Sequence, residues 1–121
     1  MTVKIKKQYH YVSLKDIRDA EKTIKRKFPV ELCQLLLIHG NGNLNGYDGD
    51  YNKILSPDEI CDLVQTHKDF QESKRTIPFF VSEPGKVFCI GINKNDTQQV
   101  FHHEKIVADS MDMFFEHIVK H

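Results

Sequence analysis

The sequence predicts an α+β domain in which helices come first, an antiparallel β-meander follows and one helix closes the chain. Apolar residues recur at helical spacing up to Phe70, whereas short apolar or alternating runs separated by turn residues begin after Arg75. Helices and strands are thus segregated along the chain, an order typical of α+β folds and not of alternating βαβ units. We expect one domain over residues 1–121, with an N-terminal helical hairpin and further helices packed on the meander.

The beginning of the chain predicts an arm followed by a first helix. Apolar and polar residues alternate in residues 1–13, which leaves two interpretations open, a loose arm and an edge strand. Ser13 followed by Asp16 is typical of a helix cap, and the apolar spacing after it predicts a helix from about Leu14 to Lys27.

A second helix is predicted from Val30 to His39, directly after Phe28-Pro29. The residue before a proline avoids the helical region, so the first helix should end there and the second should leave at an angle. The run is the most apolar decamer of the chain, which predicts a largely buried helix. Gly40 and Gly42 favour its termination, because glycine readily adopts the left-handed conformation found at helix ends.

Ser56-Pro57-Asp58-Glu59 predicts the start of a third helix, with serine as the cap, proline at the first position and Glu59 completing a capping box. This helix should end near Phe70. Its predicted inner face consists of the residues at helical spacing after the cap: Ile60, Leu63, Val64 and His67.

Three short strands are predicted next. The first spans residues 76–81, where Pro78 favours a sheet edge or a strand start. The second, residues 86–92, is apolar throughout and should be central. Residues 98–102 form the third strand of the meander.

Asp109 or Ser110 should cap the closing helix. We expect Leu36 of the second helix and Phe114 of the closing helix to be buried together. The predicted inner face of the closing helix consists of Met111, Phe114, Phe115 and Ile118.

Composition restricts the possible functions. Lys plus Arg and Asp plus Glu both number 17, so no net field attracts nucleic acid or an anionic membrane, and we expect neither as a direct partner. The three cysteines are far apart and lie among apolar neighbours, which indicates buried, reduced thiols and a cytoplasmic protein. No segment is long and apolar enough to predict a membrane span.

The polar residues do not form a recognisable catalytic or metal-binding pattern. Asp48-x-Asp50 lacks the glycine and glutamate of a calcium loop. His102-His103-Glu104 and the pair His117 and His121 lack matching ligands, so we interpret them as solvated or core histidines. The sequence therefore predicts no metal, no cofactor and no enzymatic activity.

Several short motifs occur in a fixed order from Asp16 to the C-terminus. They are Ile17-Arg18-Asp19-Ala20-Glu21, Phe28-Pro29, His39-Gly40-Asn41-Gly42, Ile77-Pro78-Phe79, Glu83-Pro84-Gly85, Val87-Phe88-Cys89-Ile90 and Ala108-Asp109-Ser110-Met111. In this order and spacing the sequence resembles the SUKH superfamily, which comprises bacterial immunity proteins related to a fungal regulator of cell-wall synthesis.

The resemblance implies a binding protein. Members of the bacterial type bind and neutralise a cognate polymorphic toxin, often a nuclease, by masking its active site, so we expect a protein toxin as partner. A second interpretation is a non-catalytic regulatory or scaffold protein of the same fold without a toxin partner. The oligomeric state is left open.

Acidic residues beside tyrosines suggest where such a partner would bind. Carboxylates could pair with the cations of a nuclease, and tyrosines are typical interface anchors, although the same composition also suits a solvated loop. The candidate partner-binding residues are Tyr47, Asp48, Asp50, Tyr51, Asp58, Glu59, Asp62 and Glu83.

Overall fold

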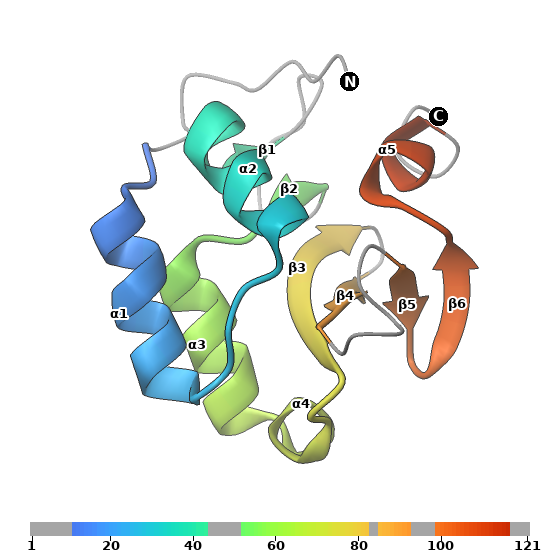
Figure 1. The fold of residues 1–121 in the computed structure, drawn as a ribbon. Helices are drawn as coiled ribbons and strands as arrows, with labels where there is room; N and C mark the ends of the chain where they lie inside the picture. Colours follow the sequence, from blue (N-terminus) through green and yellow to red (C-terminus); the bar gives the residue numbers. More distant parts are fainter. Residues whose placement is uncertain (1–10, 44–51, 83–84, 93–98, 117–121) are drawn as a thin grey trace.

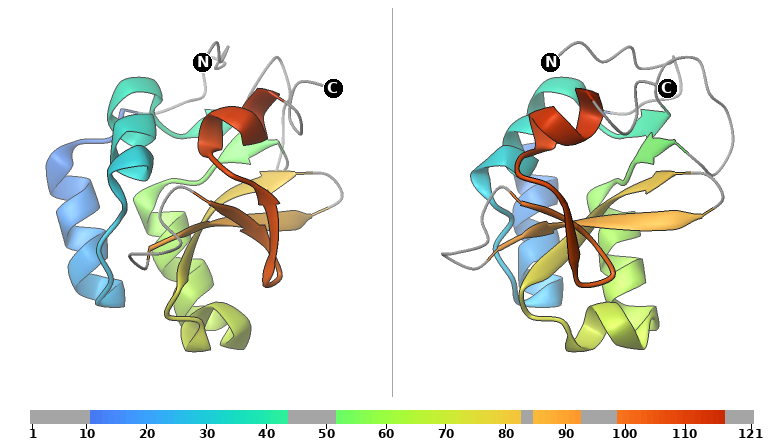
Figure 2. Two further views of the ribbon diagram at one scale, coloured as in Figure 1. Left: turned by 45° about the vertical axis from the view of Figure 1, so that its right-hand side comes forward. Right: turned by 90° about the vertical axis from the view of Figure 1, so that its right-hand side faces the viewer.

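The computed structural model describes residues 11–43, 52–82, 85–92 and 99–116. It shows a single α+β arrangement, as predicted, in which a six-stranded antiparallel sheet is accompanied by helices. Helices α1 (Leu14–Ile24) and α3 (Pro57–Thr66) lie side by side on one flank of the sheet (Figures 1 and 2). Helices α2 (Val30–His39) and α5 (Met111–Phe114) lie at one end of the molecule, and the short helix α4 (Lys68–Glu72) lies at the other end. Of the expected arm, residues 1–13, the first ten lie outside the described residues, and residues 11–13 are not part of a strand.

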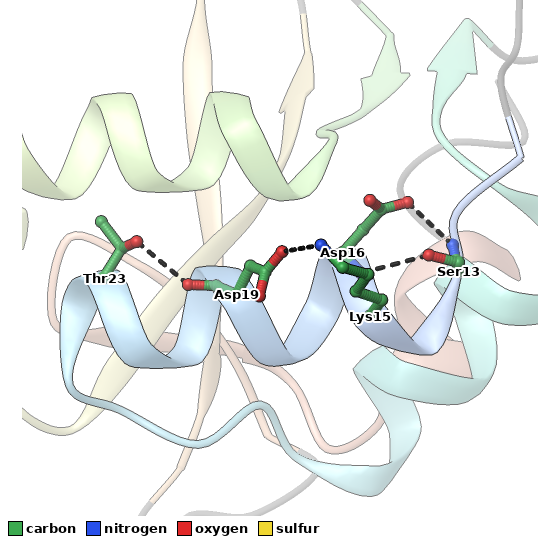
Figure 3. A network of polar contacts seen from close by, with 5 residues as sticks. All are labelled: Ser13, Lys15, Asp16, Asp19 and Thr23. Carbon is green, nitrogen blue, oxygen red and sulfur yellow. Dashed lines mark hydrogen bonds and ion pairs between the residues drawn. The ribbon is translucent and has the colours of Figure 1, made fainter.

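Helix α1 begins with the predicted cap. The amide of Ser13 donates to Asp16 Oδ2 over 3.0 Å, and the amide of Asp16 donates to Ser13 Oγ over 3.1 Å, which satisfies both backbone donors (Figure 3). The helix ends earlier than predicted, because Lys25 adopts the left-handed conformation with φ 58°. This turn directs the buried Phe28 into the core, and the amide of Phe28 donates to Glu21 Oε2 over 2.7 Å.

Helix α2 spans Val30–His39, the range that the sequence predicts, but the expectation of a largely buried helix is wrong. Leu32, Leu35 and Leu36 are buried, whereas Val30 and Ile38 are 67% and 71% exposed. The helix packs on the domain through one face only. Because both faces are apolar, the sequence pattern could not distinguish the buried face from the exposed one.

The predicted third helix is two helices, which corrects the expected end near Phe70. His67 has extended backbone angles, ending α3 and preceding α4, and its side chain is exposed rather than on an inner face. Near this end the Thr66 hydroxyl donates to the Asp62 carbonyl over 2.7 Å, the kind of local side-chain bond that slightly weakens and bends a helix.

Arg26, from the connection between α1 and α2, holds the short helix α4 in place. Its Nη1 and Nη2 atoms donate to the carbonyls of Phe70 and Gln71 over 2.9 and 2.8 Å. These bonds satisfy carbonyls at the C-terminal end of α4 that no helical amide can reach. Helix α4 is thus anchored by a residue more than forty positions earlier in the chain.

All neighbouring strands of the sheet pair antiparallel, and they follow one another in chain order. The three predicted strands are present, and the apolar β4 is central, between β3 and β5, as predicted. The sequence missed the two short strands β1 and β2 and the last strand, β6. The strands are β1 (Gly42–Asn43), β2 (Lys53–Ile54), β3 (Thr76–Ser82), β4 (Lys86–Gly91), β5 (Val100–His102) and β6 (Lys105–Ala108).

Pro78 shows how β3 accommodates a residue without an amide hydrogen. Strand β3 lies inside the sheet, but its neighbour β2 pairs only with Phe80 and Val81, so it does not reach Pro78. A register shift against β4 follows directly between Pro78 and Phe80. The proline therefore occupies a local irregularity of an inner strand, the kind of place where a missing donor is tolerated.

Aromatic rings form the centre of the core. The Phe114 ring lies 5.5 Å from both Phe79 and Phe80 and 4.8 Å from Phe88, measured between centroids. Leu36 and Phe114 are both 0% exposed and belong to the same hydrophobic cluster, which confirms the prediction that they are buried together. Ser110 caps α5, Met111 and Phe115 are buried as predicted, and Ile118 lies outside the described residues.

Candidate functional site

A surface depression of about 490 Å³ lies where the first turns of α1 and α3 meet the end of α2 and the β1–β2 pair. Three parts of the fold bring its walls together: the capping boxes of the two helices, the chain that leaves α2 through Gly40, and the two-residue strands that follow. Its lining residues are Tyr11, Val12, Asp16, Asn41, Gly42, Asn43, Lys53, Ser56, Pro57, Asp58 and Glu59.

Glu59 organises the α3 side of the depression. Its Oε1 atom accepts a 2.9 Å hydrogen bond from the Ser56 amide, while Ser56 Oγ accepts one of 3.1 Å from the Glu59 amide. Its Oε2 atom accepts from Lys53 Nζ over 2.7 Å. One carboxylate thus caps α3 and fixes the side chain of β2's lysine, and the predicted capping box is confirmed.

The protonation of Glu59 reflects these contacts. Partial burial by itself raises the pKa of this carboxyl, but the hydrogen bonds from Lys53 and Ser56 and the charge of Lys53 outweigh it, and the pKa lies below its usual value. The group therefore carries its negative charge at neutral pH, and its charge is balanced by Lys53.

The depression remains acidic when the Glu59–Lys53 ion pair is counted as neutral. Among the lining residues, Asp16 and Asp58 are two further carboxylates, and Lys53 is the lone Lys or Arg. Both aspartates are exposed, and Asp62, one turn further along α3, is exposed as well. The amide and hydroxyl of Ser13 hold the pKa of Asp16 below its usual value, so its negative charge is kept at neutral pH. The surface is thus suited to pairing with cations.

The structure brings together part of the predicted partner-binding set. Asp58 and Glu59 line the depression, and Asp62 follows on the same helix without lining it. Tyr47, Asp48, Asp50, Tyr51 and Glu83 lie outside the described residues. However, Asn43 and Lys53 are paired across β1 and β2, so residues 44–51 connect to the described chain at the depression itself.

Sequence reasoning missed two features of this end of the molecule. Asp16 comes from a different helix, and only folding places it beside Asp58. The second feature is the apolar outward face of α2, where Val30, Leu37 and Ile38 are exposed. An α2 sequence that is apolar on every side was the available signal, because a short surface helix cannot bury all of its faces.

The cysteines do not form a reactive site. All three are free, and burial raises the pKa of Cys33, of Cys61 and of Cys89, the last to about 12. Thiols with raised pKa values are weak nucleophiles at neutral pH.

Neither a metal cluster nor a membrane span occurs in the part of the chain that the structure describes. Within residues 11–43, 52–82, 85–92 and 99–116, no three His, Cys, Asp or Glu side chains gather in a way that could hold a metal ion. Over these same ranges, no helix has both the length and the apolar character needed to cross a bilayer.

Comparison with known proteins identifies relatives over nearly the whole chain. The profile described as the SMI1 / KNR4 family (SUKH-1) matches residues 11–117. Immunity protein YxxD of Bacillus subtilis (strain 168) is 23% identical over 122 residues, covering 91% of this chain and 82% of that protein. No solved structure matches the chain significantly.

Proposed function

The chain belongs to the SMI1 / KNR4 family (SUKH-1), and on this basis we propose that it is an immunity protein that binds and neutralises a cognate toxin. The observation that carries the proposal is its similarity, over 91% of its length, to a protein named as an immunity protein. In this role it acts in the cytoplasm by binding alone and has no catalytic activity of its own.

We propose further that the toxin is a nuclease whose active site is masked. A nuclease must present cations to bind the phosphates of its substrate, and such a surface attracts carboxylates. The exposed Asp58 and Asp62, with Asp16 from the neighbouring helix, supply carboxylates on one surface. Because the whole chain has no net charge, this local acidity is what supports electrostatic complementarity.

The proposed interface combines this acidic surface with the segment that joins β1 to β2. Glu59 and Lys53 fix the base of the segment, since they tie the first turn of α3 to β2. Tyrosines in the segment would serve as anchors, and carboxylates on both parts would pair with Lys or Arg of the toxin. The residues proposed for partner binding are Tyr47, Asp48, Asp50, Tyr51, Asp58, Glu59, Asp62 and, at the β3–β4 turn, Glu83.

Co-expression provides the first test of the function. Candidate toxin domains encoded beside the gene of this protein are expressed alone and together with it. We expect one of them to arrest growth alone and to be harmless in its presence, with a stable complex on purification. Failure of every neighbouring candidate to bind would favour the alternative role, a regulatory or scaffold protein without a toxin partner.

Calorimetry with the purified toxin then tests the interface. We expect the double variant Asp48→Ala, Asp50→Ala to weaken binding by about 2 kcal/mol or more while leaving stability unchanged. The pair Asp58→Ala, Asp62→Ala should weaken it too, with a smaller dependence of association on salt.

A matched control for these variants is Asp69→Ala, an exposed carboxylate on α4 at the other end of the molecule (Figure 1). It should bind like the parent. If both acidic pairs also bind like the parent, the toxin binds elsewhere, and the β3–β4 turn with the exposed face of the meander becomes the surface to test.

A further inference from the structure

A second pocket, of about 420 Å³, lies at the other end of α1 and α3 from the acidic depression. The first turns of these two helices line the depression and their last turns line the pocket, so the helices run parallel from one site to the other. In Figure 1 this end of the molecule is at the bottom, where α1 and α3 end close to α4. The proposed toxin interface does not include this pocket.

Part of the pocket wall is apolar. Ile24 and Val64 are buried in the hydrophobic cluster, and Ile92 packs against it, so the pocket opens onto the edge of the core. Its volume falls within the usual range of small-molecule sites, whose walls are mostly apolar. The pocket is therefore large enough for an organic group and not only for an ion.

The charged residues of the pocket are all positive. Lys25, Arg26 and Lys74 line it, and none of its described lining residues is acidic. Both lysines are exposed, and the backbone of Lys25 is fixed at the end of α1, where its amide donates to the Glu21 carbonyl. None of the three cations forms an ion pair with a carboxylate that the structure describes. Their charges are thus available to a ligand.

Arg26 contributes a positive charge that is partly removed from water. Its bonds to the Phe70 and Gln71 carbonyls use two of the five N–H groups of the guanidinium, so donors remain for a ligand. Partial burial lowers the pKa of this group, which nevertheless stays charged at neutral pH. A partly buried cation whose described contacts include no carboxylate favours the binding of an anion.

The helix ends near the pocket do not cancel this charge. Helices α1, α3 and α4 all end there, and the C-terminus of a helix carries about half a negative charge. Three such ends amount to about −1.5 against three full positive charges, which leaves roughly +1.5. A phosphate monoester carries about −1.5 to −2 at neutral pH and therefore matches this charge better than a single carboxylate does.

We propose that this pocket binds a phosphate monoester with an apolar or aromatic organic group. The three cations bind the phosphate, and the three apolar side chains pack against the organic group. The inference is independent of the proposed immunity function. Helix α1 has 11 residues, so its two ends are roughly 16 Å apart, and a ligand in the pocket leaves the acidic depression open to a partner.

An NMR titration of the isotope-labelled protein with phenyl phosphate tests the site. We expect saturable shifts of amide signals that line the pocket, those of Lys25, Arg26, Val64 and Ile92. Inorganic phosphate and benzoate separate the two parts of the recognition. Inorganic phosphate lacks the apolar group and benzoate carries a single charge, so each should bind more weakly than phenyl phosphate.

A pair of charge-removing variants tests the cations. The double variant Lys25→Gln, Lys74→Gln should weaken binding of phenyl phosphate about five- to tenfold, because two attractive charge contacts are lost. The matched control is Lys15→Gln, Lys86→Gln, which removes the same charge from two exposed lysines that do not line the pocket. The control should bind like the parent. All four positions are exposed, and the amide spectrum shows directly that each variant is folded.

The proposal is overturned if phenyl phosphate causes no saturable shifts at the pocket. It is equally overturned if the control pair weakens binding as much as the pocket pair, because the attraction would then come from the overall charge of the protein. Equal affinity for phenyl phosphate and either simpler anion would also contradict it, since the pocket would then not recognise both parts of the ligand.

Discussion

Replacing Leu36 with alanine tests the placement of α2 on the core. Leu36 is 0% exposed and shares the hydrophobic cluster with Phe114. Fully buried Leu→Ala substitutions cost about 2.7–5 kcal/mol, the lost transfer energy plus the cavity left behind. A domain of this size has a total stability of roughly 5–15 kcal/mol, so the variant should lose a large fraction of it. For a chain of this length that corresponds to a fall in Tm of roughly 10–20 °C.

The same helix offers a matched control in Ile38→Ala. Ile38 is 71% exposed, so its truncation removes little buried area and should change stability by no more than about 0.5 kcal/mol. Urea unfolding followed by circular dichroism gives the midpoint and the slope for the parent and both variants. Equal midpoints for Leu36→Ala and Ile38→Ala would refute the reasoning, because the two faces of α2 would then contribute alike.

Three further predictions concern single side chains, and a fourth concerns bound metal. The pKa of Glu59 in the folded protein lies below its usual value of 4.5. The ionised carboxylate therefore stabilises the fold fully above pH 4.5, and this stabilisation is lost as the pH falls through the folded-state pKa. The difference in unfolding free energy between the parent and Glu59→Gln should therefore be constant near neutrality and shrink in acid; a difference that persists unchanged at pH 3 would contradict this. Arg26→Ala should cost about 1–3 kcal/mol and expose the amides of α4 to hydrogen exchange, whereas unchanged protection would show that the two carbonyl contacts are unimportant. Cys89, with a pKa of about 12, should resist alkylation in the native state, and the purified protein should carry no stoichiometric zinc, which elemental analysis after dialysis checks.

The accuracy of the sequence-based predictions follows from how local each signal is. Helix α2 was predicted with the correct bounds because Pro29 and Gly40 act directly on the backbone at its two ends. The break at His67 was missed because no proline or glycine marks it, and the helix that follows is anchored by Arg26, which is remote in sequence. Strands β1 and β2 have two residues each, too few for any periodicity to be visible.

The candidate site, like the fold, could be predicted only where the signal lies in residues that are neighbours in the sequence. The acidic start of α3 was evident from Ser56 to Asp62, since caps and charges are properties of neighbouring residues. That Asp16 would join this surface could not be foreseen, because α1 and α3 come together only through packing, as in the contact of Cys61 Sγ with the Ala20 carbonyl at 3.7 Å. Periodicity likewise could not show which face of α2 would remain exposed.

The strand order has a consequence for how fast the chain folds. Every strand pairs with the strand that precedes or follows it in the chain, and among the described residues no helix occurs between β3 and β6. Contacts between residues close in sequence need little loop closure, and proteins rich in such contacts fold faster than those with distant pairings. Rapid maturation after synthesis suits the proposed function. An inhibitor of a toxin made by the same cell must be ready before the first toxin molecule becomes active.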